Sequence, residues 1–246
     1  MNVIQVKNLT KKYIVKQSFK DIINGNFNRK YLTALHNLNF NIKENEIVGL
    51  IGLNGAGKTT LLKIFSSLLI PDEGKIIVFN YDLGKDSEKI KKLIGLINSE
   101  ERSFYWRLSI RQNLEFFASL YGLNKKKIIL KINELLELVD LADKKNTRFD
   151  SLSTGMRQRM AIARGLLSDP KILLLDEPTK GLDIKHAEAI RKIIKKISKN
   201  KTIIITSHNL DEISELCNRV IIMHKGKIVT SGNFKDVKSV FERIIK

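Results

Sequence analysis

The sequence contains little of what a disulfide-linked, zinc-binding or membrane-spanning protein needs. Its 246 residues include one cysteine and four histidines. The single cysteine, Cys217, excludes a disulfide within the chain, and so few cysteines and histidines argue against a Cys/His zinc site. No apolar run approaches the roughly 18 residues of a membrane-spanning helix. The first residues show no basic segment followed by an apolar one, so we expect no secretion signal and a cytoplasmic compartment.

Acidic residues are also scarce. The chain has 26 of them against 44 lysines and arginines, which leaves a formal net charge of +18. Such an excess occurs in proteins that bind nucleic acids or anionic membranes. Here, however, the lysines are spread along the whole chain, and their densest run is Lys125–Lys127. We therefore interpret them as solvated surface residues and expect no nucleic-acid partner.

Residues 52–59 read Gly-Leu-Asn-Gly-Ala-Gly-Lys-Thr and fit the phosphate-binding pattern G-x-x-x-x-G-K-[ST] at every fixed position. The unalternated apolar run Ile47–Ile51 before them predicts a strand that is buried on both faces. Apolar residues after them recur at helical spacing, at Leu61, Leu62, Phe65, Leu68 and Leu69. The pattern therefore joins a strand to a helix, which is the context that a phosphate loop requires.

The glycines of this loop let successive backbone N–H groups turn inward around an anion. A helix beginning near Lys58 adds its unpaired N–H groups and the positive end of its dipole. We expect Lys58 to contact the outer phosphates of a nucleotide and the Thr59 hydroxyl to ligate Mg²⁺. The rest of the predicted cofactor-binding set in this segment is Gly52, Asn54, Gly55, Ala56, Gly57 and Thr60.

A second buried strand, Ile172–Leu175, ends in the acidic pair Asp176 and Glu177. In a parallel sheet this pair and the phosphate loop both lie at the carboxyl ends of strands, where ligands bind. We expect Asp176 to hold Mg²⁺ directly or through water. Glu177, one residue further on, is placed to accept the proton of an attacking water.

The remaining apolar patterns predict the fold class. Strands are expected at 3–8, 38–42, 75–79 and 201–206, and a hairpin at 220–230. Residues 14–33 are interpreted as an insertion between two strands, for which we consider a short helix. From about residue 100 to 167 we expect helices without strands, one of them opened by a capping box at Ser109 and Gln112. The prediction is an α/β P-loop NTPase core with a mostly parallel sheet, an N-terminal antiparallel β region and an inserted α-helical subdomain.

Residues 152–156, Leu-Ser-Thr-Gly-Met, open another helix, with Ser153 as its N-cap. At this point the sequence resembles the nucleotide-binding subunits of ATP-binding-cassette (ABC) transporters over nearly the whole chain. In that family the corresponding Leu-Ser-Gly-Gly-Gln signature contacts the γ-phosphate of ATP held by the other subunit, so that two ATP molecules join a head-to-tail dimer. Ser153 and Gly155 match the signature, whereas Thr154 and Met156 depart from it.

The resemblance implies further roles and a single nucleotide-binding domain, 1–246, with its core at about 1–98 and 168–246 and its helical subdomain at about 99–167. His208 is similar to the switch histidine that contacts the γ-phosphate. Asp183 lies in a loop that connects the two sites of the dimer, and Tyr13 matches the aromatic residue that stacks on adenine. ATP and Mg²⁺ are the implied cofactors.

One family element differs. Where the family usually has a glutamine that joins the core to the helical subdomain, residues 98–108 contain none. Alignment from either side gives Ser99 or Glu100 as its equivalent, and we favour Glu100, because a carboxylate oxygen can still ligate Mg²⁺. The aromatic run Phe104–Trp106 after it belongs either to the core or to a groove that receives a short helix of a membrane partner.

Residues 153–159 and 177–183 resemble the exporter subclass, whose subunits serve separate six-helix membrane proteins that move drugs, lipids, polysaccharides or ions. This implies a separate integral membrane permease, a homodimer or heterodimer of nucleotide-binding subunits, and a peripheral position on the cytoplasmic face of the membrane. The alternatives are a soluble ABC-type ATPase acting on DNA or ribosomes, and a regulatory nucleotide-binding module without turnover. Glu177 and His208 argue against the second of these.

Overall fold

The computed structural model describes residues 1–15, 30–98 and 104–245. Its larger sheet has six strands in the order β10-β9-β3-β8-β7-β6, parallel except for the edge hairpin of β9 and β10. These strands are β3 (Ile47–Ile51), β6 (Ile94–Asn98), β7 (Ile172–Asp176), β8 (Thr202–Thr206), β9 (Arg219–His224) and β10 (Lys227–Gly232). The central strands are apolar on both faces, as strands covered on both sides must be.

The smaller sheet is antiparallel and has the order β2-β1-β4-β5. Its strands are β1 (Asn2–Ile14), β2 (Tyr31–Lys43), β4 (Glu73–Val78) and β5 (Tyr81–Asp82). Buried and exposed residues mix along β1 and β2, because this sheet packs one face on the core and leaves the other in water. The predicted antiparallel region is therefore confirmed.

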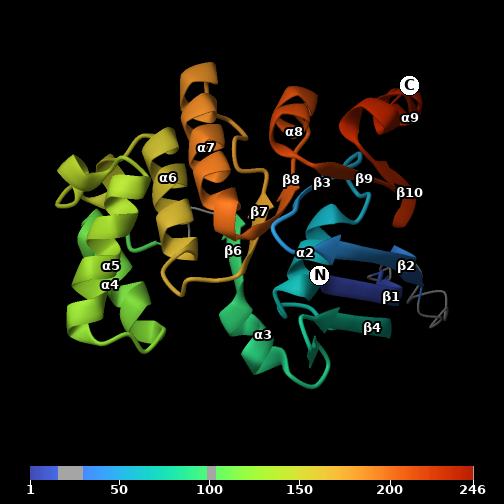
Figure 1. Cartoon of the computed structure of the whole chain (residues 1–246), viewed down its shortest axis with the longest axis horizontal. Coiled ribbons are helices and arrows are strands. Elements are labelled where there is room, and N and C mark those ends of the chain that lie inside the picture. The colour runs from blue at the N-terminus through green and yellow to red at the C-terminus, as the bar shows by residue number, and fades with distance from the viewer. Residues whose placement is uncertain (16–29, 99–103, 246) are drawn as a thin grey trace, which may run out of the picture.

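Helices surround the larger sheet, and Figure 1 shows α4 and α5 at one end of the molecule and the antiparallel strands at the other. The helices are α2 (Lys58–Phe65), α3 (Ser87–Leu93), α4 (Ile110–Leu120), α5 (Lys125–Leu138), α6 (Thr154–Gly165), α7 (Ile184–Ile197), α8 (Leu210–Leu216) and α9 (Phe234–Ile245). Short 3₁₀ turns are η2 (Ala142–Lys144), η3 (Phe149–Ser151) and η4 (Ser198–Asn200). None of the helices in the described ranges is long and apolar enough to cross a membrane.

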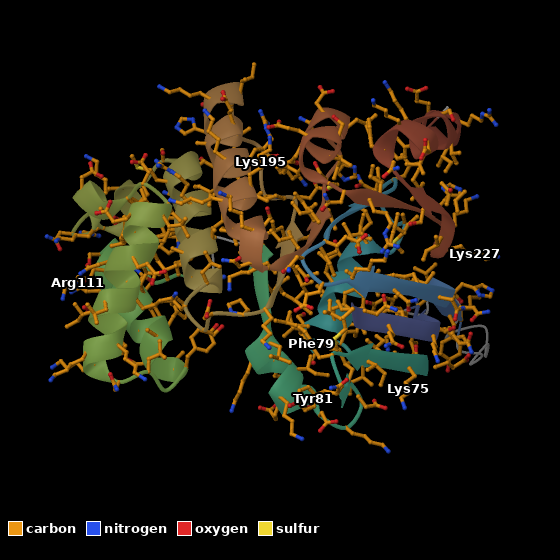
Figure 2. The ribbon with its side chains drawn as sticks, viewed as in Figure 1. Lys75, Phe79, Tyr81, Arg111, Lys195 and Lys227 are labelled. Carbon is orange, nitrogen blue, oxygen red and sulfur yellow. The ribbon has the colours of Figure 1, made fainter. Side chains whose placement is uncertain are left out.

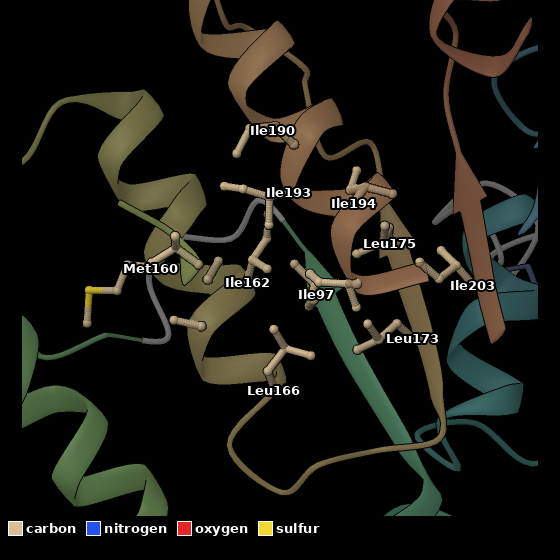
Figure 3. Close-up of a cluster of buried hydrophobic side chains, with 14 of the residues drawn as sticks. Ile97, Met160, Ile162, Leu166, Leu173, Leu175, Ile190, Ile193, Ile194 and Ile203 are labelled. Carbon is tan, nitrogen blue, oxygen red and sulfur yellow. The ribbon is translucent and has the colours of Figure 1, made fainter. Parts of the chain in front are cut away.

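The hydrophobic core has two layers, one on each face of the larger sheet. Leu173 and Leu175 of β7 face the layer beneath α6 and α7, whereas Leu174 between them faces the layer shared with the antiparallel sheet. Figure 3 shows the first layer, in which Ile162 of α6 and Ile190 of α7 come together with side chains of β6, β7 and β8. Each such side chain contributes about 1.5–3 kcal/mol when it is fully buried.

Basic side chains are scattered over the surface. Figure 2 labels Arg111 on α4, Lys195 on α7 and Lys227 on β10, on widely separated elements. Several form exposed ion pairs, such as Lys195 Nζ with a Glu215 carboxylate oxygen at 2.9 Å. This spread agrees with our interpretation of the lysines as solvated surface residues.

Side chains cap the starts of α4 and α8, and the first of these caps is the predicted capping box. The side chains of Ser109 and Gln112 each accept a hydrogen bond from the backbone N–H of the other, which completes the capping box of α4. Asn209 caps α8 by accepting from two backbone N–H groups. These bonds satisfy N–H groups that a helix leaves without partners at its start.

The structure adds three local features that the sequence patterns do not indicate. The helix after the phosphate loop ends at Phe65, and Leu68 is 66% exposed, because Ser67 turns the chain with a positive φ of 57°. The apolar stretch around 92–97 divides between the end of α3, which was not predicted, and β6. Tyr121 lies at the exposed end of α4, and Asn113 takes a buried position on that helix by bonding to backbone groups around Tyr105.

The predicted insertion at 14–33 is shorter at both ends. Strand β1 continues to Ile14 and β2 begins at Tyr31, and Tyr13 pairs with Leu32 in the antiparallel register. The short helix that we considered for this segment, at 16–29, lies outside the described residues. The pairing matters for function, because it brings Leu32 beside the tyrosine that was expected to contact adenine.

Candidate functional site

Strand register aligns the ends of the central strands. Leu50 of β3 pairs with Thr206 of β8, Thr206 pairs with Asp176 of β7, and Asp176 pairs with Asn98 of β6. The carboxyl ends of four parallel strands thus form one edge of the sheet, where the phosphate loop also begins. This is where α/β sheets place ligands.

The phosphate loop has the backbone that its glycines permit. Gly55 and Gly57 have φ values of 80° and 102°, in the left-handed region that side chains disfavour. A Cβ on Gly57 would lie 2.6 Å from the Ala34 carbonyl oxygen, and one on Gly52 would overlap the carbonyl of Met223. Other residue types therefore cannot replace these glycines without moving the loop.

Lys58 is the first residue of α2, and its side chain folds back into the loop. Its ammonium group donates to the carbonyl oxygens of Gly52 at 2.6 Å and Leu53 at 3.3 Å. Burial lowers the pKa of Lys58, while the carboxylates of Glu177 and Asp176 act in the opposite direction. A phosphate in the loop would supply the nearby negative charge that stabilises this buried cation.

Asp176 connects the loop to the centre of the sheet. One carboxylate oxygen accepts from the Thr206 hydroxyl at 2.6 Å, and the other accepts from the Thr59 hydroxyl at 3.3 Å. The Thr206 hydroxyl in turn accepts from the backbone N–H of Glu177 at 3.0 Å. Thr59 and Asp176, predicted to act on the same metal ion from 117 positions apart in sequence, therefore lie in direct contact.

Glu177 lies next to His208. Its carboxylate oxygen is 2.9 Å from His208 Nε2, and the Glu177 side chain is 17% exposed. Glu177 has a positive φ of 53°, an uncommon conformation for a residue with a side chain, fixed by hydrogen bonds from its N–H to both oxygens of Thr206. The structure therefore brings the predicted base and the predicted switch histidine together at the sheet edge.

These groups face a cavity of about 410 Å³. Tyr13 lies at its wall, 37% exposed, with its hydroxyl 3.4 Å from the Thr60 hydroxyl. The predicted residues that line the cavity are Tyr13, Asn54, Gly55, Ala56, Gly57, Lys58, Thr59, Thr60, Asp176, Glu177 and His208. One cavity thus brings together an aromatic ring, a lysine and two acidic residues, which suit a base, phosphates and a metal ion, respectively.

Sequence reasoning missed several residues of this cavity. Leu32, Thr33 and Ala34 line it from β2, and Lys180 lines it from the loop after Glu177. The first three were assigned to an insertion or to no element, although a strand paired with Tyr13 would have placed them here. Lys180 could have been found from the sequence, because it lies between the acidic pair and Asp183, which were both assigned to the site.

Four predicted residues are not among those that line this cavity. Gly52 begins the phosphate loop, and its carbonyl oxygen accepts from Lys58. Ser153 caps α6 by accepting from the Met156 N–H at 3.3 Å, and it is exposed. Gly155, two residues further along, is buried, and Asp183 is an exposed N-cap of α7. Glu100 and its alternative, Ser99, lie outside the described residues, directly after Asn98 at the sheet edge.

The site fits a nucleotide. The loop offers inward N–H groups, a buried lysine and the start of a helix to phosphates, and Tyr13 and Leu32 offer apolar surface to a base. Among the described residues no group of three or more His, Cys, Asp and Glu could enclose a metal ion by itself. Such a site suits Mg²⁺, which takes one or two protein ligands together with phosphate oxygens and water.

Comparison with known proteins gives the same answer. The family model described as "ABC transporter" matches residues 35–180. The chain is 40% identical over 205 residues to the ABC transporter ATP-binding protein NatA of Bacillus subtilis, covering 83% of each protein. The chain therefore belongs to the family of ABC transporter ATP-binding proteins.

Two solved structures share its fold and sequence pattern. The first is cbiO1 from Clostridium perfringens, part of the ABC transporter complex cbiONQ, with a TM-score of 0.82, 28% identity, and coverage of 99% of this chain and 92% of that one. The second is the ATP-binding cassette MJ0796, a dimer in a post-hydrolysis state bound to ADP and Pi, with a TM-score of 0.79, 28% identity, and coverage of 94% and 98%.

Family and site together define the activity. The chain is an ATP-binding, ATP-hydrolysing subunit that powers an ABC transporter. The predicted α/β ABC fold is confirmed by these structures. Membership of the family does not favour the alternative of a soluble ATPase acting on DNA or ribosomes.

Proposed function

We propose that two nucleotide-binding subunits close around two ATP molecules and that hydrolysis reopens them, so that the cycle drives a separate membrane permease. The observation that supports this is the division of the predicted site. Lys58, Asp176, Glu177 and His208 share one cavity, whereas the signature helix begins elsewhere on the surface. A ligand that favours the closed dimer performs work through its differential affinity for the two states.

In this proposal the phosphate loop and Lys58 bind the β- and γ-phosphates. Thr59 and Asp176 would hold Mg²⁺, which neutralises phosphate charge when it is bound. The Thr206 hydroxyl fixes one oxygen of Asp176 and leaves the other facing Thr59, so the carboxylate is oriented before any ion arrives. Tyr13 and Leu32 contact the base.

Glu177 is the proposed base, and His208 orients it. The carboxylate takes a proton from the attacking water, which requires it to share or release its contact with Nε2 of His208. His208 is 44% exposed at its side chain and can turn from Glu177 towards the γ-phosphate. When His208 turns to the γ-phosphate, it releases the Glu177 carboxylate to act as the base.

Ser153, Gly155 and Asp183 are proposed to act on the nucleotide of the second subunit. A helix N-terminus with a hydroxyl and a glycine N–H attracts anions. Helix α6 begins with the exposed hydroxyl of Ser153, and Gly155 is buried two residues further on. The second subunit is either another copy of this chain or a relative of it.

The permease is proposed to dock on the helical subdomain, which we place at about 99–167. Phe104 is buried and stacks on Phe149 with ring centroids 4.6 Å apart, so this part of the aromatic run is core. Tyr105 and Trp106 are 49% and 46% exposed, and they are available to a short helix of a partner. The protein would then lie at the cytoplasmic face of the membrane, and the exporter subclass stays our proposal on the basis of residues 153–159 and 177–183.

The Glu177→Gln variant tests the cycle. It removes the base but keeps a neutral amide of the same size, so it should bind ATP, hydrolyse it roughly a hundredfold more slowly, as expected on loss of a general base, and accumulate a dimer. Analytical ultracentrifugation with and without ATP and Mg²⁺ measures the dimer. Unchanged turnover would remove Glu177 from its role, and a monomer at saturating ATP would contradict dimer closure.

A further inference from the structure

Two helices begin side by side on the surface that we assign to the second subunit. Helix α6 begins after Ser153, and α7 begins after Asp183. Below these starts the helices pack on each other through the apolar layer of Figure 3. The two segments proposed to meet the other nucleotide are therefore held together by buried side chains of α6 and α7. Their exposed N-terminal ends need a separate contact.

His186 provides that contact. It lies in the first turn of α7, and its ring rests against Gly155 in the first turn of α6. A Cβ on Gly155 would be 2.5 Å from Cδ2 and 2.9 Å from Cγ of the His186 ring. No real Cβ approaches a carbon so closely. The His186 ring therefore leaves room only for glycine at position 155, whether or not a phosphate is bound nearby.

The other side of the same ring is held by Asp183. His186 Nδ1 lies 2.6 Å from one carboxylate oxygen, and the His186 backbone N–H donates to the other oxygen at 2.9 Å. An ionised carboxylate only accepts, so Nδ1 carries the hydrogen and donates it. These two bonds lower the pKa of Asp183 and keep it ionised.

We propose that His186 is a positioning residue that fixes the start of α6 against Asp183, and thereby sets the shape of the surface that closes over the nucleotide of the second subunit. This inference rests on the proposed dimer. It adds a residue that belongs to neither the phosphate loop, the acidic pair nor the signature. His186 is absent from the ATP cavity of its own chain, so its effect should appear in dimer closure and not in the binding of ATP by a single chain.

The test uses the Glu177→Gln chain as background, because turnover would otherwise dissolve the dimer. His186→Ala should weaken ATP-dependent dimerisation about fivefold or more, the effect of one lost hydrogen bond. The affinity of the monomer for a fluorescent ATP analogue should stay within about twofold, since the cavity is untouched. Lys192→Ala, an exposed change on the same helix, is the matched control and should alter neither quantity.

Two further variants separate positioning from general stability. His186→Asn places an amide N–H near the position of Nδ1 and should recover most of the dimerisation. Gly155→Ala should weaken the dimer, whereas Gly155→Ala with His186→Ala should be no worse than His186→Ala alone. Removal of the ring leaves only the Cβ of residue 186 near the methyl group, at 3.2 Å, and a shift of a few tenths of an ångström accommodates it. Additive losses in this cycle, or a His186→Ala chain that dimerises like the Lys192→Ala control, would overturn the proposal.

A different result would contradict the proposed function itself. If the Glu177→Gln chain stays monomeric with ATP, dimer closure is wrong. The same cycle measured on thermal unfolding then judges the contact itself: additive changes in Tm for Gly155→Ala and His186→Ala would show that the two residues do not interact.

Discussion

The phosphate-loop region and the signature region use the same physical device, a helix N-terminus, but the chain completes only the first. Around Lys58, the Asp176 carboxylate accepts from two hydroxyls and the Glu177 carboxylate contacts His208. Lys58, both carboxylates and the histidine line one cavity. Around Ser153 the cap is made, but the helix end faces outward and contributes nothing to that cavity. The first region is organised for a ligand, and the second is organised for a ligand held elsewhere.

Mutations in the two regions should therefore separate ATP binding by one chain from closure of the dimer. Changes in the first region should alter the affinity of one chain for ATP. Changes in the second should leave that affinity unchanged and alter only what two chains do together. A mutation in one region that changed the property assigned to the other would contradict this division.

Lys58→Ala should lower ATP affinity roughly a hundredfold, because it removes charge-assisted hydrogen bonds to the phosphates. The fold should persist, because burial disfavours the Lys58 cation, and this offsets the two hydrogen bonds that it donates to carbonyl oxygens of the described residues. Equilibrium binding of a fluorescent ATP analogue measures the effect, and circular dichroism checks the fold. Full affinity in this variant would contradict our assignment of the phosphate loop.

Ser153→Asp separates capping from anion binding. Aspartate caps a helix as well as serine does, so stability should be preserved. Its negative charge would face the γ-phosphate of the second subunit, and ATP-dependent dimerisation should weaken roughly tenfold or more, as expected for like charges at an interface. Sedimentation in the Glu177→Gln background measures it. A parallel drop in the ATP affinity of the monomer would break the division between the two regions.

Tyr13→Ala should lower ATP affinity roughly tenfold, the usual effect of losing one base–aromatic stack. Tyr13→Phe keeps the ring and loses only a hydroxyl whose contact with Thr60 is long, at 3.4 Å, so it should bind within about twofold of the unmodified chain. Titration of both variants with ATP is the measurement. Equal losses in the two would mean that the hydroxyl, and not the ring, is what matters.

The sequence predicts the first region better than the second, for a physical reason. Lys58, Thr59 and Asp176 follow from strand–loop patterns, because buried strands and phosphate loops impose composition locally. The contact of Leu32 with the cavity depends on how β1 pairs with β2, and that of His186 with Gly155 depends on how two helices pack. Neither pairing leaves a local pattern, so only the folded chain displays them.

The last prediction concerns stability and not nucleotide binding, and it involves Glu212, a carboxylate of α8 that is 0% exposed. Burial raises its pKa, against smaller opposite effects of the Ser207 and Thr179 hydroxyls. Between the ordinary carboxyl pKa of 4.5 and this raised value, the folded chain binds more protons than the unfolded one, so stability falls as pH rises through that window.

Glu212→Gln should remove this loss of stability. At alkaline pH the free energy of unfolding should increase by about 1.4 kcal/mol for each unit by which folding raises the pKa of Glu212. Glu215 on the same helix is the matched control of opposite sign. A hydrogen bond from Lys195 lowers its pKa, so its contribution is present above the ordinary pKa and is lost as pH falls through the lowered one. Urea unfolding of Glu212→Gln and Glu215→Gln from about pH 2 to 9, which includes the window below the ordinary carboxyl pKa, distinguishes them. If both flatten the profile in the same direction, Glu212 is ionised and paired, and the loop that carries His208 is held by charge instead of by a neutral acid.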